Sequence, residues 1–321
     1  MLADEFSLIK RYFSDCGTGA SDTLLGVGDD CALLAPPPGE VLAVTTDSLL
    51  AGVHFPLDSP ARLIGLRALA VNLSDMAAMA ATPRWFQLAL SIPEADQDWL
   101  AEFSAGLNRM ACDFNCTLVG GDTTRGPLTI SITLLGTVPP EQALQRSGAK
   151  PGDIVFVSGT LGDGAGGLAV LEGRLPVDMG GATYLQDRFW QPQARVAEGL
   201  AIRGFASAAI DISDGLLADL GHIAAASRVG AEVEVDKLPL SQVLQRSAGL
   251  ERGRNWALSG GDDYELCFTV PASGLAQCQR LIDEGVLNAT PIGRIIQGGG
   301  VHCIDEQGAL LDISTSGYQH F

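Results

Sequence analysis

Segments with strand-like and helix-like patterns alternate along the whole chain, and this alternation limits the fold more than any other feature of the sequence. A β-branched run over 41–46 is followed by a long helical pattern over 60–81, which a proline opens near its first turn. Such alternation favours an α/β or α+β architecture over a helical bundle or a β-sandwich. The expected helices cover 4–13, 60–81, 96–114, 192–203, 215–227 and 273–284, with one more after the glycine-rich loop near 160. The expected strands cover 41–46, 85–92, 117–119, 128–138, 154–158, 208–212, 231–235, 264–270 and 292–296, before a short hairpin-like tail.

A proline pair marks the best candidate for a boundary between two domains. Pro139 and Pro140 are followed by a polar run from Glu141 to Asp153 that contains a Pro-Gly-Asp turn. Breaks of this composition separate compact units. We therefore expect an N-terminal domain over 1–140 and a C-terminal α/β domain over 141–321.

Composition and charge exclude several classes of protein. The chain has 321 residues, of which 46% are hydrophobic and 18% charged, as in globular proteins. The formal net charge is −18, with 38 acidic and 20 basic residues, so no basic field for nucleic acid exists. Neither a membrane-spanning run nor a basic leader stands in the sequence, since Asp4 and Glu5 lie near the start. The seven cysteines form no Cys-x-x-Cys pair, which is typical of reduced thiols in a cytoplasmic protein.

Aspartates cluster in six short segments, usually after glycine, serine or threonine and where a strand is expected to end. The segments are GVGDDCALL (26–34), TTDSLLAGVHF (45–55), NLSDMAAM (72–79), GGDTTRG (120–126), DISDGLLADL (211–220) and SGGDDYELCF (259–268). Carboxylate and hydroxyl oxygens at such positions are the ligands that hard cations prefer. Each aspartate taken alone could also be an ordinary helix cap or turn residue. Asp75 fits that ordinary role least, because it follows Asn72 by one turn in an otherwise apolar helix.

A glycine-rich loop after the strand at 154–158 matches the pattern G-x-G-x-x-G between Gly162 and Gly167. The pattern alone is weak, and a tight crossing from strand to helix explains it as well as a dinucleotide site does. Other nucleotide and nucleophile signatures are absent from the sequence, including G-x-x-x-x-G-K-[ST], the protein-kinase motifs and G-x-S-x-G.

Taken in order, these segments resemble the thiamine-monophosphate kinases, within the superfamily of aminoimidazole-ribonucleotide and selenophosphate synthetases. The similarity runs from EFSLIKRYF (5–13) to SGYQHF (316–321), and its longest words are NLSDMAAM, GGDTTRGPL, RSGAKPGD, AIDISDGLLADLGHI and ALSGGDDYELCF. The resemblance implies a two-domain α/β protein whose N-terminal sheet domain, over 1–140, binds metal and ATP and pairs across a homodimer. The domain over 141–321 would complete the ATP and substrate site. The implied reaction moves the γ-phosphoryl group of ATP directly onto thiamine monophosphate, giving thiamine diphosphate and ADP.

The resemblance also implies a role for particular residues. The metal ligands would be Asp30, Thr45, Thr46, Asp47, Asp75, Asp122, Asp211 and Asp214; ATP would contact Gly121, Asp122, Arg146 and Ser213; and the thiamine substrate would contact His54, Asp262 and Tyr318. Asp262 departs from the glutamate expected in some relatives and is one methylene shorter, so we expect a water-mediated contact there.

Charge and chemistry agree with this assignment. ATP is a polyanion, so a chain of −18 is expected to hold it only with several Mg²⁺ ions between the two sets of negative charge. A phosphate acceptor is already ionised near neutral pH, which removes the need for a nucleophile or a general base. Asp47, Asp75 and Asp122 would act through Mg²⁺.

Three alternatives remain at this point: another ATP-dependent synthetase or kinase of the same superfamily, a non-catalytic metal- or nucleotide-binding regulator, and a nicotinamide oxidoreductase built on the glycine-rich loop. A selenide-activating enzyme would want a lysine beside the reactive cysteine, and none stands beside Cys16.

Overall fold

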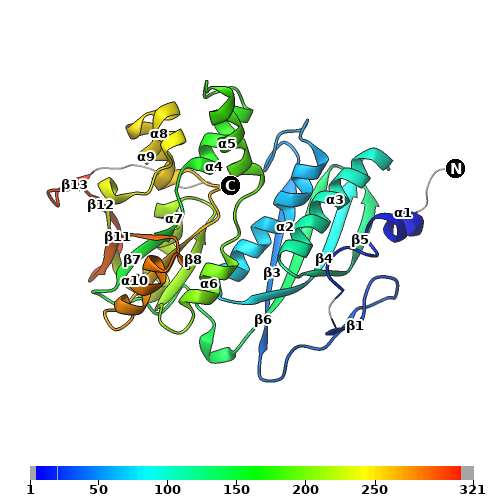
Figure 1. Ribbon diagram of the computed structural model, residues 1–321, viewed down its shortest axis with the longest axis horizontal. Helices are drawn as coiled ribbons and strands as arrows, with labels where there is room; N and C mark the ends of the chain where they lie inside the picture. The colour runs from blue at the N-terminus through cyan, green and yellow to red at the C-terminus, as the bar shows by residue number, and fades with distance from the viewer. Residues whose placement is uncertain (1–4, 20, 312–321) are drawn as a thin grey trace. The chain divides into compact units, whose positions relative to one another are not determined.

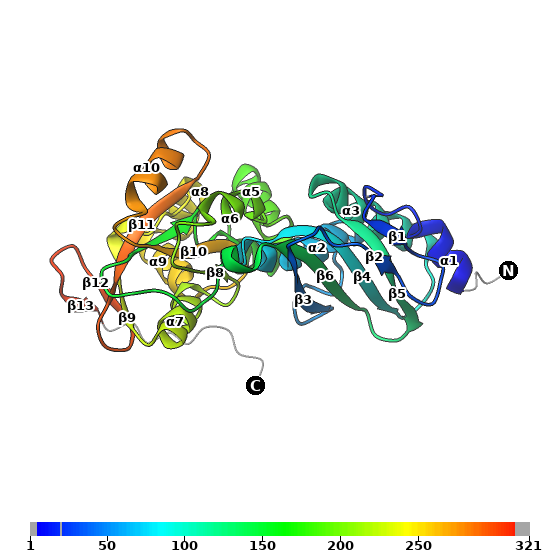
Figure 2. The same cartoon turned by 90° about the horizontal axis from the view of Figure 1, so that it is seen from below.

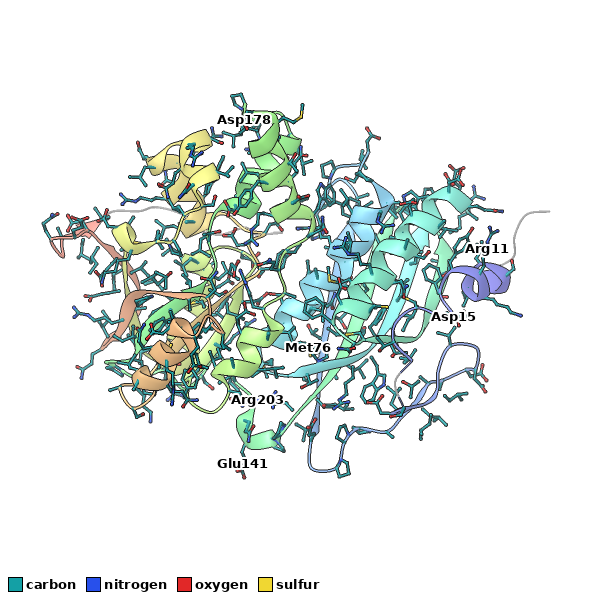
Figure 3. All side chains as sticks on the ribbon, in the orientation of Figure 1. Arg11, Asp15, Met76, Glu141, Asp178 and Arg203 are labelled. Carbon is teal, nitrogen blue, oxygen red and sulfur yellow. The ribbon has the colours of Figure 1, made fainter. Side chains whose placement is uncertain are left out.

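The computed structural model describes residues 5–19 and 21–311, with side chains from residue 7 onward. The chain divides into two compact units. Among the described residues, unit 1 contains those up to 76 and those from 81 to 141, and unit 2 contains residues 77–80 and 142–311. Met76 and Glu141, labelled in Figure 3, are the last residues of the two segments of unit 1. Each predicted site residue that the structure describes lies in one of these two units.

Unit 1 is built on a four-stranded sheet with the order β3-β6-β4-β5 (Figure 1). Its strands are β3 (Val41–Leu50), β4 (Thr82–Ile92), β5 (Thr117–Arg125) and β6 (Thr129–Val138). Strand β6 pairs antiparallel with β3 and β4, whereas β5 pairs parallel with β4. The helix over 97–113, between β4 and β5 in the chain, supplies the crossover that a parallel pair requires.

Two helices, α2 (Ala61–Ala78) and α3 (Gln97–Asp113), cover one face of this sheet (Figure 2). Alternate residues of β4 are buried beneath them, including Leu88 and Leu90, while Gln87 between the buried positions is exposed. The two helices approach closely at Gly106, where an added β-carbon would lie 2.0 Å from the carbonyl oxygen of Arg62. The opposite face of the sheet therefore remains available for polar and exposed apolar side chains.

The N-terminal segment holds α1 (Glu5–Tyr12) and the short strands β1 (Thr23–Leu25) and β2 (Leu33–Leu34). It is anchored to the start of β4, because Arg84 donates to Asp22 at 2.8 Å and the indole of Trp85 donates to Thr23 at 3.0 Å. These contacts fix the base of the glycine-aspartate loop that connects β1 and β2.

Unit 2 contains a seven-stranded sheet with the order β13-β12-β9-β11-β7-β10-β8. All neighbours are antiparallel except β12 and β9, which run parallel. The strands are β7 (Ile154–Ser158), β8 (Ala208–Ile212), β9 (Gly230–Glu234), β10 (Glu265–Val270), β11 (Ala289–Ile296), β12 (Gly300–Ile304) and β13 (Leu310–Leu311). Strand β10, which lies between β7 and β8, is buried along its whole length.

The helices of unit 2 are α4 (Asp163–Leu171), α5 (Met179–Trp190), α6 (Val196–Ile202), α7 (Leu216–Ser227), α8 (Gln242–Ala248), α9 (Leu250–Ser259) and α10 (Leu275–Asp283). Helix α7 packs on this sheet against β8, β9, β10 and β12. Helices α4, α5, α8 and α9 pack against one another, and α9 also contacts α7. Short 3₁₀ turns occur at Pro140–Gln142 and Val235–Lys237.

The mixed architecture of helices and sheets confirms the expected α/β (α+β) fold class. The sequence pattern missed α5, α8 and α9, which lie in the stretches 172–191 and 236–259 where no regular element was expected beyond the helix after the glycine loop. The strand expected over 117–119 was too short, since β5 continues to Arg125. Among the described residues, no helix is both long and apolar enough to cross a membrane.

Candidate functional site

A cavity of about 620 Å³ opens in unit 1 beside the glycine-aspartate loop that connects β1 and β2. Asp29 and Asp30 approach it from that loop, and Asp122 approaches it from β5. Its lining also includes Ile9, Phe13, Val27, Gly28, Cys31, Ala32, Gln87, Leu88, Ala89, Leu118, Val119, Gly120, Gly121, Thr123, Ser131 and Thr133. The structure thus brings together Asp30, Gly121 and Asp122, three of the residues that the sequence assigned to metal and ATP.

The strand register places Asp122 on the sheet face opposite α2 and α3. Asp122 pairs with Ala89, Ala89 with Ser131, and Ser131 with Ser48, so these four residues share one face. Gly121 has φ +148, and an added β-carbon would lie 1.9 Å from the Leu88 carbonyl oxygen. Only glycine fits this approach of β5 to β4.

The expectation that the aspartates end strands was wrong for two of them. Asp122 lies inside β5 and Asp47 lies inside β3. The polar sequence around each suggested a loop, but both strands continue because their backbone groups stay paired across the sheet.

A second group of predicted ligands lies on the helix-covered face of the same sheet. The hydroxyl of Thr45 on β3 donates to Asp75 on α2, and the Asp47 carboxyl is hydrogen-bonded to Asp75 as well. Burial, then the charge of Asp75, then this hydrogen bond raise the pKa of Asp47 from its ordinary 3.8 to about 7. Two carboxyl groups held this close need a proton or a cation between them, and an all-oxygen set of this kind fits Mg²⁺.

Thr46 does not join that group, because its side chain points to the other face of β3. Its hydroxyl lies 2.9 Å from that of Thr133, which lines the cavity. The predicted ligands of unit 1 are therefore divided between the two faces of the sheet. Within 5–19 and 21–311, no three His, Cys, Asp or Glu side chains come together in a group that could hold a metal ion.

In unit 2, four predicted residues gather where β8 ends and β10 begins. Asp211 is buried on β8, and Ser213 and Asp214 follow it in a turn before α7. Asp262 lies against this turn, since its backbone N–H donates to the Ser213 carbonyl at 2.9 Å. The turn carrying Asp214 and the turn carrying Asp262 are therefore fixed to each other.

Asp219 on α7 holds the first of these turns, a role that the sequence did not assign. Its carboxyl accepts the backbone N–H groups of Ser213 at 3.0 Å and Asp214 at 3.1 Å. Burial raises the pKa of Asp219 to about 7, against the lowering effect of these backbone donors. The segment DISDGLLADL contains Asp219, but its spacing alone reads as one helical turn and gives no sign of a backward contact.

Three further predicted residues stand apart from these groups. Arg146 is exposed in a loop. The backbone carbonyl of the preceding residue, Gln145, accepts the Ala209 N–H, which places this loop beside β8. His54 is half-buried after β3, and its Nδ1 accepts the Leu50 N–H at 3.0 Å. Nδ1 is therefore unprotonated and the neutral ring carries its proton on Nε2. Tyr318 lies outside the described residues.

The glycine-rich loop that resembles a dinucleotide motif receives a carboxyl group of the protein itself. Asp263, 1% exposed, accepts the N–H groups of Gly162 at 2.6 Å and Gly164 at 3.0 Å, at the N-terminus of α4. Anions bind this end of a helix favourably. Asp263 thus fills the place that a pyrophosphate takes in a dinucleotide site, in agreement with the purely structural interpretation of the motif.

A buried ion-pair network next to this loop was not foreseen from the sequence. Glu265, fully buried, accepts from Arg188 at 2.7 Å and from Arg195 at 2.6 and 2.8 Å, and Ser158 donates to it at 2.5 Å. These residues are far apart in the chain, so no local pattern could have joined them.

The chain matches two family models in succession. Residues 28–138 match the N-terminal domain of AIR synthase related proteins, and residues 150–306 match the C-terminal domain of the same group. A curated relative from Escherichia coli (strain K12), named thiamine-monophosphate kinase, is 46% identical over 100% of this chain and 99% of its own.

Solved structures agree over nearly the same length. The crystal structure of thiamine-monophosphate kinase from Stenotrophomonas maltophilia superimposes with a TM-score of 0.84 at 50% identity, covering 89% of this chain and 92% of that one. A structure described as AaThiL complexed with AMPPCP and TMP gives a TM-score of 0.79 at 34% identity, covering 92% of each chain.

Proposed function

The chain belongs to the thiamine-monophosphate kinases of the AIR-synthase-related group, and from that membership we propose Mg²⁺-dependent transfer of the γ-phosphoryl group of ATP onto thiamine monophosphate. The products are thiamine diphosphate and ADP. The observation that carries the proposal is similarity over the full length to kinases of this name, one of them solved with AMPPCP and TMP.

Four aspartates of unit 1 are proposed metal ligands. Asp30 and Asp122 lie at the cavity, and Asp47 and Asp75 lie on the helix-covered face of the sheet. The hydroxyls of Thr45 and Thr46 complete this set. Mg²⁺, when bound, would neutralise most of the charge of the phosphates, because a chain with a net charge of −18 has few cationic side chains to do so. Gly121 lines the cavity beside Asp122, and this supports its assignment to ATP.

In unit 2, Asp211 and Asp214 are the remaining proposed ligands, and Ser213 is proposed to contact the nucleotide. Arg146, in the exposed loop beside β8, carries a permanent positive charge that suits a phosphate oxygen. The protein's own task in the reaction is to bind and orient the two phosphates and to exclude water. No side chain has to remove a proton, because a phosphate monoester with a second pKa of about 6 is already ionised at neutral pH.

His54 and Asp262 are proposed to bind the thiamine substrate. With its proton on Nε2, His54 offers a neutral hydrogen-bond donor. Asp262 offers a carboxylate to the cationic heterocycle, and as a residue one methylene shorter than glutamate it is proposed to act through water. Tyr318 remains part of the proposal as an aromatic partner for the same ring.

We also propose that the protein is a cytoplasmic homodimer that pairs through the sheet of unit 1. The edge strand β3 exposes Leu42 at 49%, Val44 at 60% and Leu50 at 38%, which by strand alternation share the face opposite α2 and α3. Apolar side chains exposed together in this way are typical of an interface. A second copy of the same face would cover them symmetrically.

A coupled assay of ADP release tests the proposed activity. Thiamine monophosphate, thiamine and aminoimidazole-ribonucleotide precursors are offered in parallel, with Mg²⁺ and ATP. We expect ADP release that depends on thiamine monophosphate. Release with the precursors alone would indicate another synthetase of the superfamily, and ATP binding without release in any arm would indicate a regulator.

A further inference from the structure

Asp263 directly follows Asp262, which is proposed to bind the thiamine substrate, but the side chain of Asp263 is itself buried. Its carboxyl group is held at the N-terminus of α4 by the N–H groups of Gly162 and Gly164. Burial raises the pKa of Asp263 well above its ordinary value, against the lowering effect of these two backbone donors. Asp263 therefore ties the segment 260–264 to α4 through two hydrogen bonds.

Gly164 on α4 lies directly against the backbone of this segment. A β-carbon at Gly164 would lie 2.3 Å from the Asp262 carbonyl oxygen and 3.0 Å from the Asp263 backbone nitrogen. The absence of a side chain allows α4 to touch the peptide that joins the two aspartates. Gly166 on the same helix instead faces the ends of the Leu244 and Leu185 side chains, at 2.9 and 3.3 Å.

The segment needs such support because its backbone is unfavourable for L-residues. Asp262 has φ +72 and Tyr264 has φ +51, both in the left-handed region. The N–H of Asp262 donates to Ser213, and that of Tyr264 donates to the Ile212 carbonyl at 2.8 Å. A strained turn of this kind persists only where its surroundings hold it.

We propose that Asp263 is a positioning residue for phosphoryl transfer. Together with Gly164, against which the segment 260–264 packs, Asp263 holds this segment in place. The segment in turn presents Asp262 and aligns the adjoining turn of Ser213 and Asp214. This role rests on the proposed function, because it assumes that Asp262 serves the thiamine substrate. Asp263 itself touches no substrate and acts through the backbone of its neighbours. The glycine-rich loop thereby acquires a function that is unrelated to nucleotide binding.

Asp163 provides a matched control at the same end of α4. It is fully buried, it accepts from Thr160 at 2.6 Å, Tyr184 at 3.1 Å and Ser241 at 2.6 Å, and it lies 3.8 Å from the guanidinium of Arg188. None of these contacts involves the segment 260–264, on which Asp163 acts only through its charge. Asp163→Asn therefore makes the same change of residue at this end of α4 while leaving the hydrogen bonds of that segment in place.

The experiment compares two pairs of variants, Asp263→Asn with Asp163→Asn and Gly164→Ala with Gly166→Ala. Melting temperature, kcat, and KM for thiamine monophosphate and for ATP are measured for each protein. We expect Asp263→Asn and Gly164→Ala to lower kcat/KM for thiamine monophosphate about tenfold or more, because small displacements of substrate-positioning groups have effects of this order. The two controls should melt earlier or unchanged and keep KM within about twofold.

Amide hydrogen exchange gives a second readout that does not depend on turnover. Faster exchange at Asp262 and Tyr264 is expected in Asp263→Asn and Gly164→Ala, and unchanged exchange in the controls. Kinetic constants and exchange like those of the wild type in Gly164→Ala would overturn the proposal, even if Asp263→Asn fails to fold. Equal losses in Asp163→Asn and Asp263→Asn would also overturn it, as a general effect on stability. If the wild-type protein releases no ADP, the proposed function fails, and unchanged exchange in Gly164→Ala would separately reject the positioning role.

Discussion

The metal-free protein should lose stability as the pH rises from 5 to 7.5, because of the carboxyl pair Asp47 and Asp75. The pKa of Asp47 is raised to about 7 in the folded protein by burial and by Asp75, while the unfolded chain keeps the ordinary value of 3.8. Between these values the folded state binds the extra proton, so the free energy of unfolding falls as pH increases. The stabilisation is complete below pH 3.8 and is lost as pH passes through about 7.

The magnitude follows from the two pKa values. At 1.36 kcal/mol per pH unit, the shift of Asp47 corresponds to about 4 kcal/mol in all, of which about 2.5 kcal/mol falls between pH 5 and 7.5. Asp47 is only partly buried, and solvent screening lowers the latter figure to about 1 kcal/mol. For a compact unit of this size, that corresponds to a change of about 4 °C in melting temperature.

The assay is thermal melting in EDTA at several pH values for the wild type, Asp75→Asn and the exposed control Asp113→Asn. Asp75→Asn removes the neighbouring charge but leaves the burial of Asp47, so the fall in melting temperature with pH should shrink without vanishing. Millimolar Mg²⁺ should flatten the wild-type curve, because the cation binds the ionised carboxylates. An identical pH dependence in the wild type and Asp75→Asn would refute the reasoning.

Three further predictions concern other parts of unit 1. Cys31 lines the cavity, whereas Cys112 is exposed elsewhere. Mg²⁺ with ATP should therefore slow the alkylation of Cys31 several-fold and leave that of Cys112 unchanged, as measured by peptide mass spectrometry. Equal protection of both cysteines would count against nucleotide binding in the cavity. Val44→Glu should produce monomers in light scattering, because it would bury an unpaired charge in the proposed dimer interface. The control Val286→Glu changes an exposed apolar residue of unit 2 and should leave the dimer intact. An unchanged mass in both variants would exclude β3 as the interface. Asp122→Asn should reduce turnover about a hundredfold or more with an unchanged far-UV spectrum, if its carboxylate holds Mg²⁺; near-normal kinetics at limiting Mg²⁺ would contradict that role.

The sequence located the alternation of elements well, because strand and helix periodicities are local. Most of the expected strands of unit 2 lie within three residues of the observed ones, as at 154–158 and 208–212. Asp47 and Asp122 were expected at strand ends, since polar runs look like loops, and their strands continue because the sheet supplies partners. Pairing across a sheet is a non-local property that one strand's sequence does not contain.

The candidate site was predictable in its residue types and less so in its arrangement. The segments that supply Asp30, Asp122, Asp214 and Asp262 were recognised from words of sequence. That Thr45 and Thr46 point to opposite faces follows from strand alternation once the strand is known to continue. The supporting role of Asp263 depends on a contact with a loop about a hundred residues away, which only the folded structure reveals.

The most direct test of the proposed function follows the phosphorus atom itself. The protein is incubated with Mg²⁺, thiamine monophosphate and ATP labelled at the γ-phosphate, and the products are separated and counted. We expect the label in the terminal phosphate of thiamine diphosphate, with one ADP formed for each product molecule. Label released as inorganic phosphate, or retained in ATP while thiamine monophosphate remains unchanged, would contradict the proposed function.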